Sequence, residues 1–141
     1  MSRYFHKDGI HLRYPETWAA ELEEAGDSWT LILQSPEIAF FLISLRPEAP
    51  NAEQLAEETL EALRADYPQL DAREVIGEYA GQPALGHDIE FISIDTCVTC
   101  WTRCLEAAAG PLLVMGQTCE YDHEQNDLIL KQISLSLRVE D

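Results

Sequence analysis

Three consecutive segments in the second half of the chain decide the fold: ALGHDIEFISI (84–94), CVTCWTRCLEA (97–107) and LLVMGQTCEY (112–121). Each is rich in apolar, β-branched and aromatic residues, which favour strands, and only a few residues separate one segment from the next. Strands joined by such short connections pair antiparallel. We therefore predict that this region forms two or three neighbouring strands of an antiparallel sheet, which contain all four cysteines of the chain.

Turn residues and alternating apolar residues predict more strands ahead of this region. Asp8-Gly9 suits a turn with positive φ, and apolar residues alternate with polar ones after it, so residues 3–14 are expected to form a hairpin with one buried face. The segment 38–45 is nearly all apolar and is expected to be covered on both faces. The other predicted strands are residues 18–24, 29–34 and 71–79.

Two helices are predicted from capping residues and helical spacing. Asn51 and Gln54 form a capping-box pattern at the start of residues 51–66, where an apolar stripe lies opposite a glutamate-rich face. Asp122 begins the second helix, 122–137, with a glutamine three positions later. The pattern predicts an α+β fold: an antiparallel sheet of about six or more strands flanked by these two main helices. The chain of 141 residues has no internal repeat or linker, so we expect one domain, 1–141.

The charge balance excludes several classes of partner. The chain has 26 acidic and 9 basic side chains, which gives a net charge of −17. Nucleic acids repel such a surface, because their affinity for proteins rests on Lys and Arg, and an anionic membrane surface is disfavoured for the same reason. We therefore expect no nucleic-acid partner and no membrane partner. The acidic surface favours solubility, or else a basic partner or a cation.

The sequence also predicts a compartment. The first residues lack the apolar run and cleavage site of a signal peptide, and no window has the ~18 apolar residues of a membrane span. We therefore expect a cytoplasmic protein, unless a leader has been removed. Thiols stay reduced in the cytoplasm, so the cysteines do not predict a disulfide framework.

Several short motifs resemble the PsbP/DcrB-like superfamily, which includes the Ran-binding Mog protein. The matching stretches are I-x-L-x-Y-P-x-x-W (10–18), Ser35-Pro36 before an apolar strand, the acidic helix that starts at Asn51, IGEYAGQPAL (76–85) and SLRV (136–139). Together they cover nearly the whole chain, although the cysteine cluster has no counterpart in this pattern. The resemblance implies an antiparallel sheet between helices and a function in binding, because known members are mostly non-enzymatic. It implies no catalytic residues.

The cysteines raise the possibility of a metal or redox site. The alternative set is Cys97, Cys100, Cys104, Cys119 and His123, whose short spacings are typical of zinc ligands. On a continuous strand, however, Cys100 and Cys104 lie roughly 13 Å apart at ~3.3 Å per residue. Two thiolates on one zinc ion must lie within about 4 Å of each other. We therefore favour thiols packed in the core and predict no metal and no cofactor.

One pair of thiols is predicted to face each other. If residues 108–111 form a four-residue connection, Ala107 pairs with Leu112, and Cys100 then lies opposite Cys119. Directly opposed residues have Cα atoms ~4.5–5.5 Å apart, which lies inside the ~4.4–6.8 Å range of disulfides. The sequence thus predicts that Cys100 and Cys119 form a cross-strand pair that air would oxidise.

No other motif points to an enzyme. The chain has no phosphate-binding glycine loop, no nucleophile elbow and no paired-histidine zinc motif. Acidic residues around His123 are typical of a helix start. His6, His11 and His87 fall on predicted strands without an evident partner. We therefore predict a non-enzymatic binding or adaptor domain that engages a protein partner through its sheet face or an acidic edge. The alternative is a thiol-based metal-binding or redox protein, and the sequence predicts no oligomeric state.

Overall fold

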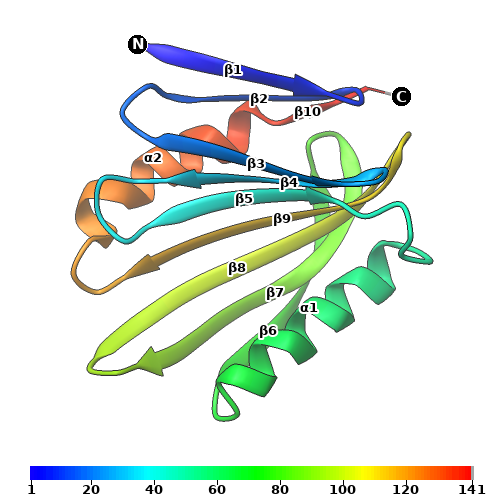
Figure 1. Ribbon diagram of the computed structural model, residues 1–141. Coiled ribbons are helices and arrows are strands. Elements are labelled where there is room, and N and C mark those ends of the chain that lie inside the picture. The colour runs from blue at the N-terminus through cyan, green and yellow to red at the C-terminus, as the bar shows by residue number, and fades with distance from the viewer. Residues whose placement is uncertain (141) are drawn as a thin grey trace.

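The computed structural model describes residues 1–140, in which ten strands and two helices follow one another along the chain (Figure 1). The elements are β1 (Ser2–Lys7), β2 (Ile10–Pro15), β3 (Ala19–Ala25), β4 (Ser28–Gln34), β5 (Phe40–Leu45), α1 (Ala52–Asp66), β6 (Asp71–Tyr79), β7 (Gln82–Ser93), β8 (Thr96–Ala107), β9 (Gly110–Cys119), α2 (His123–Ser136) and β10 (Arg138–Val139).

A 7-stranded antiparallel sheet in the order β3-β4-β5-β9-β8-β7-β6 forms the body of the molecule. A 3-stranded sheet, β1-β2-β10, packs beside α2 (Figure 1). The predicted α+β class is confirmed, and so is an antiparallel sheet flanked by two helices. The sequence did not predict the separation of the first hairpin into a second sheet, because β10 is only two residues long and gives little periodic signal.

Helix α1 covers the β7-β8-β9 part of one sheet face. The Asn51 side chain accepts a hydrogen bond of 2.7 Å from the Gln54 N–H, so the predicted N-cap is confirmed. Leu60 packs on apolar residues of β7 and β8, including Phe91, and the Tyr67 ring after the helix stacks on Phe91 with centroids 4.0 Å apart. The apolar stripe of α1 thus faces the sheet, as the sequence predicted.

Helix α2 and the small sheet cover the opposite face over β4, β5 and β9. Helix α2 begins directly after Asp122, but the predicted capping box is wrong, because the Asp122 side chain does not cap the helix. The carboxylate instead accepts backbone N–H groups from Ile38, Ala39 and Cys119 at 3.0, 2.6 and 2.9 Å. It therefore ties the β4–β5 connection to the end of β9.

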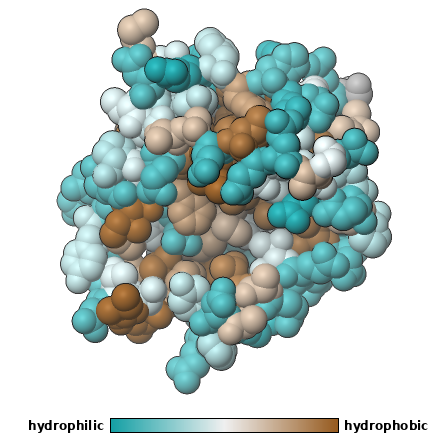
Figure 2. Space-filling view, viewed as in Figure 1, coloured by the Kyte–Doolittle hydropathy of each residue, from teal (hydrophilic) through white to brown (hydrophobic). Residues whose placement is uncertain are grey.

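Strand β5 lies third from one edge of the sheet and is buried mainly on the α2 side, where Phe41 and Ile43 are fully buried. On the α1 side, Phe40 and Leu42 are only half-buried, because α1 does not extend over β4 and β5. The prediction that both faces of this strand are covered is therefore wrong for one face. Figure 2 shows apolar side chains at the surface on this side of the molecule, in patches in its middle and toward its left and lower-left edges.

Neither helix of residues 1–140 is long and apolar enough to span a bilayer.

The hairpin between β1 and β2 turns at Asp8 and Gly9, whose φ angles of 51° and 79° confirm the predicted turn with positive φ.

Candidate functional site

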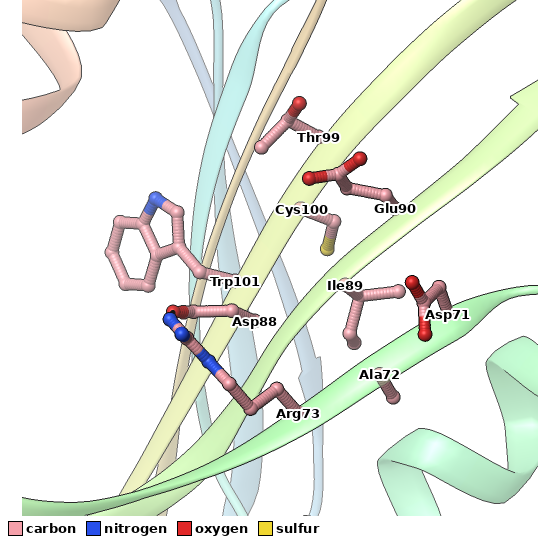
Figure 3. A pocket seen from close by; sticks show the side chains of 9 residues that line it. All are labelled: Asp71, Ala72, Arg73, Asp88, Ile89, Glu90, Thr99, Cys100 and Trp101. Carbon is pink, nitrogen blue, oxygen red and sulfur yellow. Dashed lines mark hydrogen bonds and ion pairs between the residues drawn. The ribbon is translucent and has the colours of Figure 1, made fainter.

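A groove of about 510 Å³ lies over β6, β7 and β8 on the sheet face that α2 covers only in part (Figure 3). Its lining is Asp71, Ala72, Arg73, Asp88, Ile89, Glu90, Thr99, Cys100 and Trp101. Side chains of neighbouring strands pair in rows across the floor. Asp71, Glu90 and Thr99 form one row, and Arg73, Asp88 and Trp101 form the next. A second hollow of about 340 Å³ continues past Trp101 to Arg103 and α2.

Asp88 is held between two guanidinium groups in the second row. One carboxylate oxygen accepts from Arg73 Nη2 at 2.9 Å and the other from Arg103 Nη2 at 3.0 Å. Burial acts to raise the pKa of Asp88, but the hydrogen bonds and charges of the two arginines outweigh it and hold that pKa below its ordinary value. The group therefore stays ionised at neutral pH and holds both arginines in place. Figure 3 shows its contact with Arg73.

The Trp101 ring stands beside this ion pair and is positioned by a glycine. Gly116 lies directly opposite on β9, and a Cβ atom there would approach the indole ring to 2.6 Å. Phe41 meets the ring edge-on with centroids 5.9 Å apart, and the Arg103 guanidinium lies 5.9 Å from the ring centroid. Trp101 is half-buried, so an ordered indole surface remains open to the groove.

The first row carries an unbalanced negative charge. Asp71 and Glu90 are direct cross-strand partners on β6 and β7, and both are exposed. Like charges placed directly opposite each other on neighbouring strands destabilise the pair. Within residues 1–140, neither carboxylate has a hydrogen bond or ion pair with another residue. This arrangement leaves two carboxylates available to a cationic group from outside.

The four cysteines are free, and three of them belong to the core. Cys97 is exposed, whereas Cys100, Cys104 and Cys119 are buried. Cys97 and Cys100 point to opposite faces of β8. Burial raises the pKa of both Cys100 and Cys104 to about 12. Both are therefore protonated at neutral pH, whereas metal binding and nucleophilic attack require the thiolate.

The predicted opposition of Cys100 and Cys119 is wrong. Cys100 lies opposite Gln117, and Val98 lies opposite Cys119, because Ala107 pairs with Gly110 across a two-residue turn. The register differs by two residues, so both thiols still lie on the α1 side and share one core cluster. Diagonal neighbours have Cα atoms roughly 7–8 Å apart, beyond the range of an unstrained disulfide.

Comparison with known proteins gives a likeness in structure alone. No family model and no curated protein matches the sequence. The structure of cyanobacterial PsbP from Synechocystis superposes with a TM-score of 0.69 and 11% identity, over 99% of this chain and 92% of that one. The fold is PsbP-like.

Two other solved structures share this PsbP-like fold. PA94 from Pseudomonas aeruginosa has a TM-score of 0.61 and 16% identity, over 99% of this chain and 98% of that one. LpqN, which is involved in cell envelope biogenesis of Mycobacterium tuberculosis, has a TM-score of 0.56 and 11% identity, over 100% and 91%. The resemblance found in the sequence motifs is confirmed at the level of fold. At such low identity, the likeness carries no function to this chain.

The PsbP-like fold also gathers histidines that the sequence left without partners. In residues 1–140, the groups of three or more possible metal ligands are His6–His11–Glu140 and Glu57–Glu74–His87. No cysteine belongs to either group, so the alternative ligand set of four cysteines and His123 is not brought together. His123 instead lies on the surface of α2, 3.4 Å from the Asp127 carboxylate.

The pairing of His6 with His11 could have been predicted from the sequence. His6 and His11 are equally distant from Asp8-Gly9, so a two-residue turn places them opposite each other, as the structure does. The groove had no such signal, because Arg73, Asp88 and Trp101 come from three strands, and their meeting depends on two strand registers at once.

Proposed function

We propose that this protein is a non-enzymatic binding module whose partner is a protein with a basic segment that lies in the groove over β6, β7 and β8. The observation that carries the proposal is the unpaired couple of Asp71 and Glu90, which lies in the groove one row away from the open Trp101 ring. A lysine or arginine of the partner would relieve the repulsion between the two carboxylates. Its aliphatic stem would pack on the indole, as long basic side chains do on apolar surfaces.

The protonation state of Asp88 favours recognition over proton transfer. A general acid or base works best with a pKa near the operating pH. The pKa of Asp88 is instead held below its ordinary range by Arg73 and Arg103, so this group keeps one charge state at neutral pH. Fixed charges and a rigid aromatic ring supply orientation and specificity at an interface.

The overall charge adds to this proposal. A net charge of −17 speeds the encounter with a basic partner and suppresses binding to acidic ones. The proposal places the protein in the cytoplasm, where its four free cysteines stay reduced. The partner's basic segment then supplies the affinity through the groove, and the rest of the surface supplies long-range attraction.

Selection from a random peptide library on the wild-type protein tests the proposal. We expect the selected peptides to be rich in Lys and Arg and to change the fluorescence of Trp101, which is half-buried, whereas Trp18 and Trp29 are buried. The double variant Asp71→Asn, Glu90→Gln should bind these peptides roughly tenfold more weakly, or about 1.4 kcal/mol.

A matched control removes two carboxylates elsewhere. Glu53→Gln with Glu58→Gln lowers the charge by the same amount on the exposed side of α1, far from the groove floor. If peptide affinity falls equally in both double variants, net charge alone explains the effect, and the proposed binding in the groove is refuted. Selected peptides without basic residues, or a failure to select any binder, would also refute the proposal.

A further inference from the structure

The outer face of the small sheet carries two histidines and a glutamate whose ligand atoms converge. His6 on β1 and His11 on β2 are direct cross-strand partners, and their rings stack with centroids 4.0 Å apart and planes 14° apart. Glu140, which follows β10, places one carboxylate oxygen against both rings. That oxygen lies 3.7 Å from His6 Nε2 and is hydrogen-bonded to His11 Nε2.

We propose that these three residues form a binding site for a divalent transition-metal ion of the zinc class. Imidazole nitrogens and a carboxylate are ligands that zinc, nickel and copper ions accept. The candidate ligand atoms of His6, His11 and Glu140 all lie within 4.8 Å of one another. A tetrahedral zinc ion with bonds of ~2.0–2.1 Å needs ligand atoms roughly 3.3 Å apart, so small side-chain movements bring the three together.

The backbone holds the site in place from three sides. His6 and His11 are fixed by the register of the β1–β2 hairpin, and the β10 ladder pairs Arg138 with His11. The Glu140 N–H then donates to the Gly9 carbonyl at 2.8 Å, which anchors the glutamate beside the turn. Ligands on strands whose register is set in this way lose little freedom on binding an ion.

Electrostatics and access also fit a cation. Glu140 places an anionic carboxylate oxygen against both imidazole rings, and such an oxygen attracts a divalent cation. His6 and Glu140 are more than half exposed, which leaves a path for the ion and room for water as a fourth ligand. The bound ion would join the first hairpin to the last strand, which is held by a ladder of only two residue pairs.

Zinc titration by calorimetry, on protein whose purification tag has been removed, tests the site. We expect one zinc ion per chain and a rise in Tm on zinc addition, because an ion that binds only the folded state stabilises it. His11→Ala and Glu140→Gln should each weaken binding by at least roughly 10- to 100-fold, the loss caused by disturbing even the groups behind a ligand. Circular dichroism checks that each variant keeps its fold.

Matched controls separate this site from the other groups. Glu74→Gln alters the second histidine–carboxylate group, His123→Ala removes an exposed histidine on α2, and Cys97→Ser removes the exposed thiol. All three should bind zinc as the wild type does. Loss of binding in any of them, or affinity retained in the His6→Ala, Glu140→Gln double variant, would overturn the assignment, as would the absence of saturable binding to the wild type.

Proton NMR supplies a readout for individual histidines, because the chain has only 4 of them. Substoichiometric Ni²⁺ should broaden the imidazole signals of His6 and His11 first, and those of His87 and His123 only later. Prior broadening of His87 or His123 would contradict the proposed site. This measurement does not depend on the groove over β6, β7 and β8, so either proposal can fail while the other holds.

Discussion

Asp122 is expected to be among the most sensitive single positions in the chain. Its side chain is only 2% exposed and accepts hydrogen bonds from the backbone N–H groups of Ile38, Ala39 and Cys119. In Asp122→Ala these three donors lose their acceptor inside the protein. A buried donor without a partner costs roughly 1–3 kcal/mol, so with partial access of water we expect a loss of roughly 3–6 kcal/mol of unfolding free energy. Asp122→Asn should cost about half as much, because one oxygen remains while the new NH₂ group faces a donor.

Urea unfolding followed by circular dichroism measures these losses. The matched control is Asp127→Asn, which removes a carboxylate on the exposed side of α2 and should change stability by less than about 0.5 kcal/mol. A loss below about 0.5 kcal/mol in Asp122→Ala would show that the three hydrogen bonds do not hold the β4–β5 connection to β9.

The pH dependence of the same variants gives a second test. Burial acts to raise the pKa of Asp122, but the backbone hydrogen bonds from Cys119, Ala39 and Ile38 outweigh it and lower that pKa below its ordinary value of 3.8. A carboxyl group with a lowered folded-state pKa contributes stability that is fully present above its unfolded pKa and is lost as the pH falls through the folded one. The difference in unfolding free energy between the wild type and Asp122→Asn should therefore be constant above about pH 5 and shrink below about pH 4. Titrations of the other carboxylates cancel in this difference, so a gap that stays constant down to pH 2 would contradict the reasoning.

Three further predictions test the core, the thiols and the surface charge. Leu60→Ala should lower the unfolding free energy by roughly 2–5 kcal/mol, because Leu60 is 6% exposed and packs on β7 and β8, and denaturant unfolding measures this loss. A thiol reagent at neutral pH should modify Cys97 quickly and leave Cys100 and Cys104 unreacted until the protein unfolds; rapid labelling of either buried thiol would show that the sheet opens. A gel-shift titration should show no saturable binding to duplex DNA at physiological salt, since the net charge is −17, and salt-sensitive binding would contradict that expectation.

Most of the local structure could be predicted, because it follows from short-range chemistry. Asp8-Gly9 marks a turn by its own conformational preference, and Asn51 marks a helix start by its capping oxygen. The turn between β8 and β9 was predicted to span residues 108–111. In the structure Pro111 lies within β9, opposite Glu106, where its carbonyl accepts the Arg46 N–H at 2.9 Å. That contact with a distant strand end has no trace in the local sequence.

The role of Asp122 was missed for a similar reason. An aspartate before a helical stretch predicts an N-cap, and the capping pattern is local. The observed partners, Ile38 and Ala39, are more than eighty residues away, and they meet the carboxylate only because β5 pairs with β9. A residue type that suits two roles is assigned to the local one when the sequence is considered alone. The tertiary hydrogen bonds to buried backbone groups then decide which role it takes.

The groove shows most clearly where a sequence stops being informative. Asp71, Arg73, Asp88 and Trp101 each alternate with inward-facing residues, and on a single strand each is an ordinary solvent-facing side chain. Only the registers of β6 with β7 and of β7 with β8 place two acids side by side in one row and an ion pair beside an indole in the next. A uniformly stable sheet would avoid the first row, since opposed like charges cost stability. Departures of this kind from local consistency are expected at functional sites, and for this reason the row of Asp71 and Glu90 is a stronger indication of a binding surface than the volume of the groove.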